Sequence, residues 1–202
     1  MICPEHHPDW DPLAADHTPY VQWSLDQLRE HRGRLVLSRP YNVHRLNATR
    51  IGWSELIGEK AVLNFLPGSV PGQNKFDLSG STYTTVRGIQ WSGHGADVAR
   101  TIVFVGAEEG GESTKLVFDG CFGSGPCAAA VFYVYGVTNW SMRSTSFQLQ
   151  EGPLGTHALS LTAQNWAAVT SEYLQVHQGG IDIYGAVFTD VEAHHMVSHP
   201  DG

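Results

Sequence analysis

The chain has 202 residues, of which 42% are hydrophobic and 16% are charged, and its formal net charge is −8. This length suits one domain with one hydrophobic core. The negative charge argues against nucleic acid as a partner, because binding to a phosphate backbone depends on Lys and Arg, and only 12 are present. The sequence contains no run of about 18 apolar residues, so we expect no membrane-spanning helix and no membrane partner.

Residues 1–15 are rich in Pro, His and Asp and show no hydrophobic period, so we expect an extended N-terminal arm. The first residues also lack the basic stretch and apolar run of a secretory signal. We therefore expect synthesis in the cytoplasm without export.

The next segment predicts a helix over about 18–32. Pro19 suits the first helical turn, and apolar residues follow at Val21, Leu25 and Leu28 with helical spacing. Gly33 marks the end of the helix. We assign this helix to a single domain over residues 16–202.

Beyond residue 33 the apolar runs are short, often β-branched or aromatic, and separated by Gly, Ser, Asn or Pro, which predicts an all-β body. Four of these segments end on an aromatic residue, and the repeat between them is roughly 25 to 30 residues, a scale typical of stacked-repeat folds. We predict a parallel β-solenoid with one interior column of rings, and a β-sandwich remains an alternative. The four rings are Trp91, Phe122, Phe147 and Tyr173.

Residues 16–43, together with the repeated segments, resemble the pectate-lyase-like family of right-handed parallel β-helices. The first stretch contains an Asp-x-Thr segment, the predicted helix, a glycine, and a strand that ends near a proline and a tyrosine. The resemblance implies a short, right-handed, single-stranded β-helix with the helix capping its open end, and often a polysaccharide partner. The matching positions are Asp16, Thr18, Val21, Gln22, Leu25, Asp26, Leu28, Gly33, Val36, Leu37, Pro40 and Tyr41.

Candidate catalytic and metal-binding residues are few. Glycoside hydrolysis needs two carboxylates about 5 to 9.5 Å apart, and no two acids match at the outward positions of the aligned repeats. His94 and Asp97 form the one candidate acid–base pair, although a Gly-rich connection explains the same residues. Three histidines near residue 196 could bind Zn²⁺ or Ni²⁺, although a polar tail is the simpler interpretation. They are His194, His195 and His199, and we expect no cofactor.

Two tryptophans and two cysteines leave structural alternatives open. Trp140 and Trp166 occur in similar segments and are predicted to stack on each other. They suit either the core or a subunit interface, and they could also serve as platforms for a glycan. Cys121 and Cys127 flank a small loop, and the sequence does not decide whether they form a disulfide.

These features predict a non-catalytic structural or attachment protein of a phage-like virion, either a capsid-decorating protein or a tailspike-type protein. The N-terminal arm would bind a capsid or tail, and polysaccharide is a further expected partner. Uncovered strand edges favour association, and the resemblance to virion β-helices implies a homotrimer. The alternative is a polysaccharide lyase or glycoside hydrolase whose site lies in a loop or between subunits.

Overall fold

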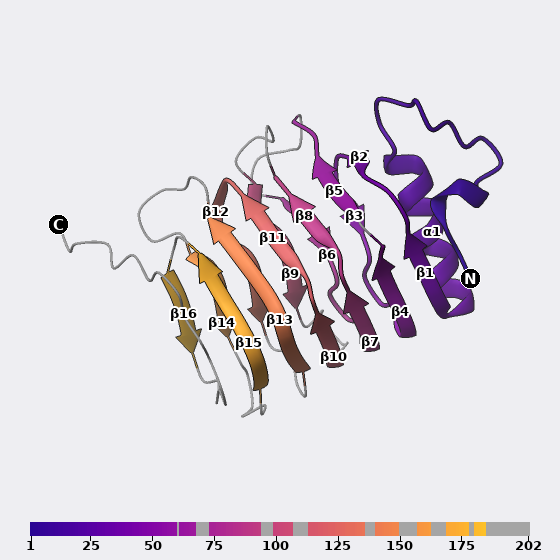
Figure 1. Cartoon of the computed structure of the whole chain (residues 1–202). Coiled ribbons are helices and arrows are strands. Elements are labelled where there is room, and N and C mark those ends of the chain that lie inside the picture. Colours follow the sequence, from indigo (N-terminus) through magenta and orange to yellow (C-terminus); the bar gives the residue numbers. More distant parts are fainter. Residues whose placement is uncertain are drawn as a thin grey trace.

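The computed structural model describes residues 1–59, 61–67, 73–93, 99–106, 113–135, 140–149, 157–162, 169–177 and 180–184. Within these residues the chain is mostly β-strand, with a single α-helix near the N-terminus (Figure 1). The paired strands are parallel to one another. An all-β fold with parallel sheets, as the sequence predicts, is therefore present. No helix of the described part is long and apolar enough to cross a membrane.

The strands form three sets and two sheets. The first set contains β1 (Gly33–Leu37), β4 (Gly52–Gly58), β7 (Thr82–Arg87), β10 (Thr114–Asp119), β13 (Trp140–Leu149) and β15 (Val169–His177). The second set contains β2 (Tyr41–Val43), β5 (Val62–Phe65), β8 (Gln90–Ser92) and β11 (Phe122–Gly125), and it joins the first set in one ten-stranded sheet. The third set forms a six-stranded sheet of β3 (Leu46–Asn47), β6 (Asn74–Asp77), β9 (Ala99–Gly106), β12 (Cys127–Tyr135), β14 (His157–Thr162) and β16 (Gly180–Tyr184).

The pairing follows a three-strand period. From β1 to β10, each strand pairs with the strand three places later in the chain. β13 is longer than its predecessors and pairs with both β10 and β11. Residues one repeat apart therefore lie side by side on adjacent strands, at the usual spacing of about 4.8 Å.

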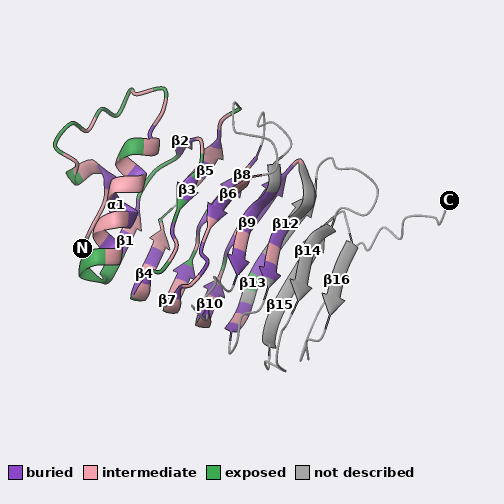
Figure 2. Cartoon of the chain, turned by 180° about the vertical axis from the view of Figure 1, so that it is seen from behind, coloured by how far each residue is buried: buried purple, intermediate pink, exposed green. Residues whose placement is uncertain are grey.

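The core lies between the two sheets and consists of inward-facing columns of apolar side chains. Figure 2 shows that strands of both sheets carry buried residues. Rings from the two sheets meet there, with the centroids of Phe118 and Phe132 5.0 Å apart at an interplanar angle of 88°. The column of the first set contains Leu35, Leu56, Val86, Phe118 and Met142, each no more than 1% exposed. The column of the third set contains Leu46, Phe76, Val103 and Phe132.

The predicted column of four aromatic rings is wrong at its first step. Trp91 is buried, as expected, but its register partner is Gly123. Phe122 lies opposite Gln90 and is partly exposed. The reason is a turn at Gly120, where φ is 62°, after which Cys121 is the first buried residue. Because successive side chains in a strand alternate between faces, the next residue, Phe122, faces outward.

The later repeats do not restore that column. Phe147 lies opposite Gly123, and in the following strand the partner of Phe147 is Val176. Tyr173 lies earlier in β15 than Val176 and therefore falls outside the row that contains Trp91 and Phe147. The four chosen aromatic residues therefore do not share one register row.

The single α-helix of the described part, α1 (Thr18–His31), matches the helix predicted over 18–32. Its apolar face buries Val21, Leu25 and Leu28. The helix contacts β1, β2 and β3 and covers the N-terminal end of the core (Figure 1). This position shields the first inward-facing residues from water.

Residues 1–15 are not a free arm, contrary to the prediction. Ile2 pairs with β1, because its N–H donates to the carbonyl of Arg34 at 2.8 Å and its carbonyl accepts from Val36 N–H at 2.9 Å. The short 3-10 helix η1 (Pro4–His6) follows and buries Pro4. Trp10 then packs edge-on against Tyr20, with the centroids 5.1 Å apart. The segment has no hydrophobic period, yet it covers the outer edge of β1.

Candidate functional site

The predicted catalytic and metal-binding residues lie outside the described residues. This holds for His94 and Asp97, and for His194, His195 and His199. Within the described part of the chain, no group of three or more His, Cys, Asp or Glu side chains is placed to hold a metal ion. The acid–base pair and the histidine cluster therefore stay predictions.

Trp140, one of the two tryptophans chosen from the sequence, does not stand on the surface. Trp140 is only 3% exposed and belongs to the hydrophobic core. Its register partner in β15 is Val169, while Trp166 lies outside the described residues. Trp140 is therefore a core residue, which is one of the alternatives that the sequence left open, and it is not available to a ligand.

A different aromatic pair stands on the outer face of the ten-stranded sheet. Trp53 of β4 and Tyr83 of β7 stack face to face, with ring centroids 3.8 Å apart and an interplanar angle of 7°. Their exposed fractions are 58% and 38%, so both rings remain accessible to solvent. Among the residues that the structure describes, these are the large exposed apolar side chains that lie on a strand.

The pair lies in a row of residues with left-handed backbone. Gly52 pairs with Thr82, and Ser54 pairs with Thr84, so Trp53 and Tyr83 occupy equivalent positions between them. The row continues to other repeats and takes positive φ throughout. It comprises Arg32 (57°), Trp53 (55°), Tyr83 (50°) and Lys115 (54°). Such a conformation costs a non-glycine residue roughly 1–2 kcal/mol, and it is rarer still for a bulky residue.

Lys115 covers the far side of the aromatic pair. Its Nζ lies 4.5 Å from the centre of the Tyr83 ring and donates a hydrogen bond to the Tyr83 hydroxyl at 3.1 Å. A cation over an exposed ring contributes about 0.5–1 kcal/mol. This contact favours the observed orientation of Tyr83, and the stack with Tyr83 favours that of Trp53.

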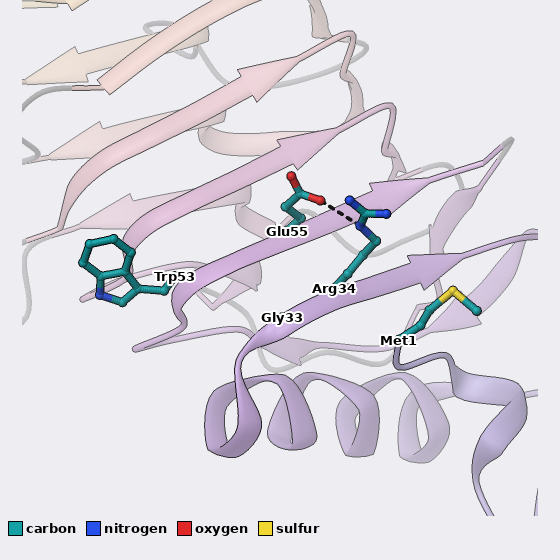
Figure 3. Close-up of a pocket in the computed structure, with 5 residues that line it drawn as sticks. All are labelled: Met1, Gly33, Arg34, Trp53 and Glu55. Carbon is teal, nitrogen blue, oxygen red and sulfur yellow. Dashed lines mark hydrogen bonds and ion pairs between the residues drawn. The ribbon is translucent and has the colours of Figure 1, made fainter.

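A hollow of about 480 Å³ borders the near side of the pair, and it is lined by Met1, Gly33, Arg34, Trp53 and Glu55. Arg34 of β1 and Glu55 of β4 are register partners, and Arg34 Nε donates to Glu55 Oε2 at 2.8 Å. Figure 3 shows this ion pair between Trp53 and Met1 on one face of the sheet. The hollow thus combines an aromatic side chain with a charge-compensated polar pair.

A polar cluster fastens the N-terminal segment to the body of the fold. The hydroxyl of Tyr41 donates to Glu5 Oε1 at 2.7 Å, and the hydroxyl of Ser38 donates to the same oxygen at 3.2 Å. Burial and then the hydrogen bond to Glu5 raise the pKa of Tyr41 above its ordinary value. Tyr41 therefore stays a neutral donor at neutral pH, and the cluster holds η1 against the body.

The two described thiols have no catalytic character. Cys3 and Cys121 are both free, so Cys121 is not joined to Cys127. Burial raises the pKa of the Cys3 thiol, and it raises the pKa of Cys121 to about 12. Because the thiolate is the nucleophile, neither group is activated at neutral pH.

The sequence did contain a signal for the exposed pair. Trp53 and Tyr83 are separated by one repeat of the fold, and each directly precedes a buried Ser or Thr. A search for aromatic residues at the ends of segments passes over them, because both stand near the start of a strand.

No protein family, curated protein or solved structure matches the chain.

Proposed function

We propose that this chain is a short, right-handed, single-stranded parallel β-helix, capped by α1, that serves as a non-catalytic attachment protein and binds glycan on its outer face. The three-strand pairing period supports the helical arrangement. The resemblance of residues 16–43 to the pectate-lyase-like family supports the same fold. The observation that carries the binding function is the exposed stack of Trp53 and Tyr83.

The aromatic pair suits a sugar for two physical reasons. The apolar C–H face of a pyranose ring can cover an exposed aromatic ring and remove it from water, which is favourable. Fully burying a large side chain of this kind is worth about 1.5–3 kcal/mol. In the free protein, the strained backbone at Trp53 and Tyr83 is accompanied by only partial burial of the two rings, which remain 58% and 38% exposed. A ligand that covers the rings supplies a reason for keeping large residues there.

The scaffold presents these rings with little freedom. Trp53 and Tyr83 lie on adjacent paired strands, whose inward neighbours Ser54 and Thr84 are buried. A rigid platform loses little conformational entropy when it binds, which favours affinity. This arrangement suits a protein that attaches to a surface polysaccharide.

We test the binding function by replacing one ring. In a panel of immobilised polysaccharides, the protein binds at least one glycan, and Trp53→Ala weakens that binding by about tenfold to hundredfold. Leu13→Ala is the control, because Leu13 is 90% exposed and lies off the sheet. Unchanged affinity in Trp53→Ala, or no binding to any glycan, would contradict the proposal. Release of oligosaccharides that depends on His94 and Asp97 would favour a lyase or hydrolase.

The proposed setting is a phage-like virion, in which the chain forms a homotrimer on a capsid or tail. This part of the proposal is supported by the family resemblance. Residues 1–10 pack against β1 and α1, so the attachment surface would be part of the folded body. Light scattering tests the trimer, since three chains of 22.1 kDa give a mass clearly distinct from a monomer. A uniform monomer at high concentration would refute it.

A further inference from the structure

We infer that the hollow between Met1 and Trp53 is a subsite for one uncharged pyranose unit that presents two adjacent hydroxyl groups. This inference rests on the glycan-binding function proposed above and adds to it a location and a ligand class. The hollow has a volume of about 480 Å³ and is shallow, because most of it is open to solvent.

The first wall is the free face of Trp53. One face of the indole is covered by Tyr83, whose strand β7 lies on one side of β4. The hollow lies on the other side of β4, where β1 and Met1 complete it. A sugar ring in the hollow therefore meets the uncovered face of Trp53, while Tyr83 and Lys115 support the indole from behind.

The ion pair of Arg34 and Glu55 supplies the polar contacts. Only Arg34 Nε and Glu55 Oε2 are used in their hydrogen bond, and among the described residues no other bond involves these side chains. Glu55 Oε1 can therefore accept from one hydroxyl group, while an Nη group of Arg34 donates to the neighbouring oxygen. Adjacent donors and acceptors of this kind match a vicinal diol.

The charge of the site selects an uncharged sugar. Arg34 and Glu55 compensate each other at 2.8 Å, so these two side chains together add no net charge to the hollow. The carboxylate of an acidic sugar in the hollow would lie close to the carboxylate of Glu55, in a chain whose formal net charge is −8. The ammonium group of an amino sugar would lie close to the guanidinium group of Arg34. A neutral unit meets neither repulsion.

The geometry also limits the site to one unit. Met1 and Trp53 bound the hollow at opposite ends, and the ion pair lies between them (Figure 3). Trp53 and Glu55 are next-nearest neighbours on β4, so their side chains are about 6.6 Å apart along the strand. One ring can stack on the indole and reach the ion pair with its hydroxyl groups at the same time.

The experiment is titration of the full chain with neutral glucan, mannan and galactan hexasaccharides and with polygalacturonate and alginate. We expect binding of at least one neutral sugar, with a loss of about tenfold in Arg34→Gln. Arg87→Gln is the matched control, because Arg87 forms a similar cross-strand ion pair with Asp119 and the two arginine side chains are 54% and 58% exposed. Methylation of the adjacent hydroxyl groups of the bound sugar should abolish the same binding.

The outcomes separate this inference from the broader function. Binding to acidic glycans alone, or equal affinity in Arg34→Gln and the wild type, would overturn the subsite and leave glycan binding on Trp53 and Tyr83 intact. Absence of binding to every glycan would overturn both. Thermal unfolding of each variant shows whether a loss of affinity reflects a loss of folded protein.

Discussion

The two faces of the strands β1, β4, β7 and β10 differ in how their large side chains are placed. Those on the inward face are buried, whereas those on the outward face are exposed to solvent. The inward column of Leu35, Leu56, Val86 and Phe118 has no more than 1% exposure. At the start of the same strands, the outward row includes exposed residues with φ near 50–57°, among them Trp53 and Tyr83. Burial explains the first group, because each side chain leaves water. Burial explains the second group only in part, because the backbone there is strained while the side chains of Trp53 and Tyr83 remain partly exposed.

The largest expected effect comes from breaking the inward column. Phe118→Ala removes a ring that packs edge-on against Phe132, and we expect a loss of about 3–5 kcal/mol in the free energy of unfolding. Tyr83→Ala removes an outward ring and should cost no more than about 1.5 kcal/mol. Chemical denaturation measures the loss in each variant, provided that the free energy of unfolding depends on denaturant concentration with the same slope as in the wild type. A larger cost for Tyr83→Ala would mean that the stack is mainly structural.

An intermediate effect is expected in the turns that separate the first and second sets of strands. A Cβ on Gly58 would lie 2.5 Å from the carbonyl oxygen of Gly88, so Gly58→Ala should cost about 1–3 kcal/mol. Gly120 has φ of 62° but an open environment, and Gly120→Ala should cost only about 1 kcal/mol. Ser144, which follows in the same row with φ of 47°, shows that a side chain is tolerated there. Equal costs in thermal unfolding would contradict this ranking.

The smallest effect should have the opposite sign. Arg32 ends α1 with φ of 57° and ψ of −179°, a conformation that strongly favours glycine. Arg32→Gly should therefore stabilise the chain by about 0.5–1 kcal/mol, since a glycine at this position relieves strain at the helix end. Denaturant midpoints of the two proteins measure the difference. A lower stability of Arg32→Gly would show that the exposed Arg32 side chain stabilises the fold by more than its backbone strain costs.

The hydrophobic pattern was sufficient to predict the strands and the helix. Val21, Leu25 and Leu28 have helical spacing and lie on the buried face of α1. Short β-branched and aromatic runs became strands because such side chains pack well on a pleated surface. These features depend on local periodicity, which a sequence displays directly.

Register was not predictable from the same pattern. Aligning Trp91 with Phe122 treats the two aromatic residues as equivalent, whereas the turn at Gly120 places Gly123 opposite Trp91. A shift of one residue moves a side chain to the other face of a strand. Trp53 and Tyr83 were overlooked for a related reason, because their stacking depends on the pairing of β4 with β7.

The sequence by itself determined the class of fold, the helix at the N-terminal end and the burial of Trp91, since each follows from which residues avoid water. Only the tertiary structure decided which residues lie next to each other across strands. That choice placed Trp53 on Tyr83 and Arg34 beside Glu55, and it folded the N-terminal segment onto β1. Pairing between strands one repeat apart depends on turns and on steric fit at single positions such as Gly58 and Gly120, and no local pattern encodes these.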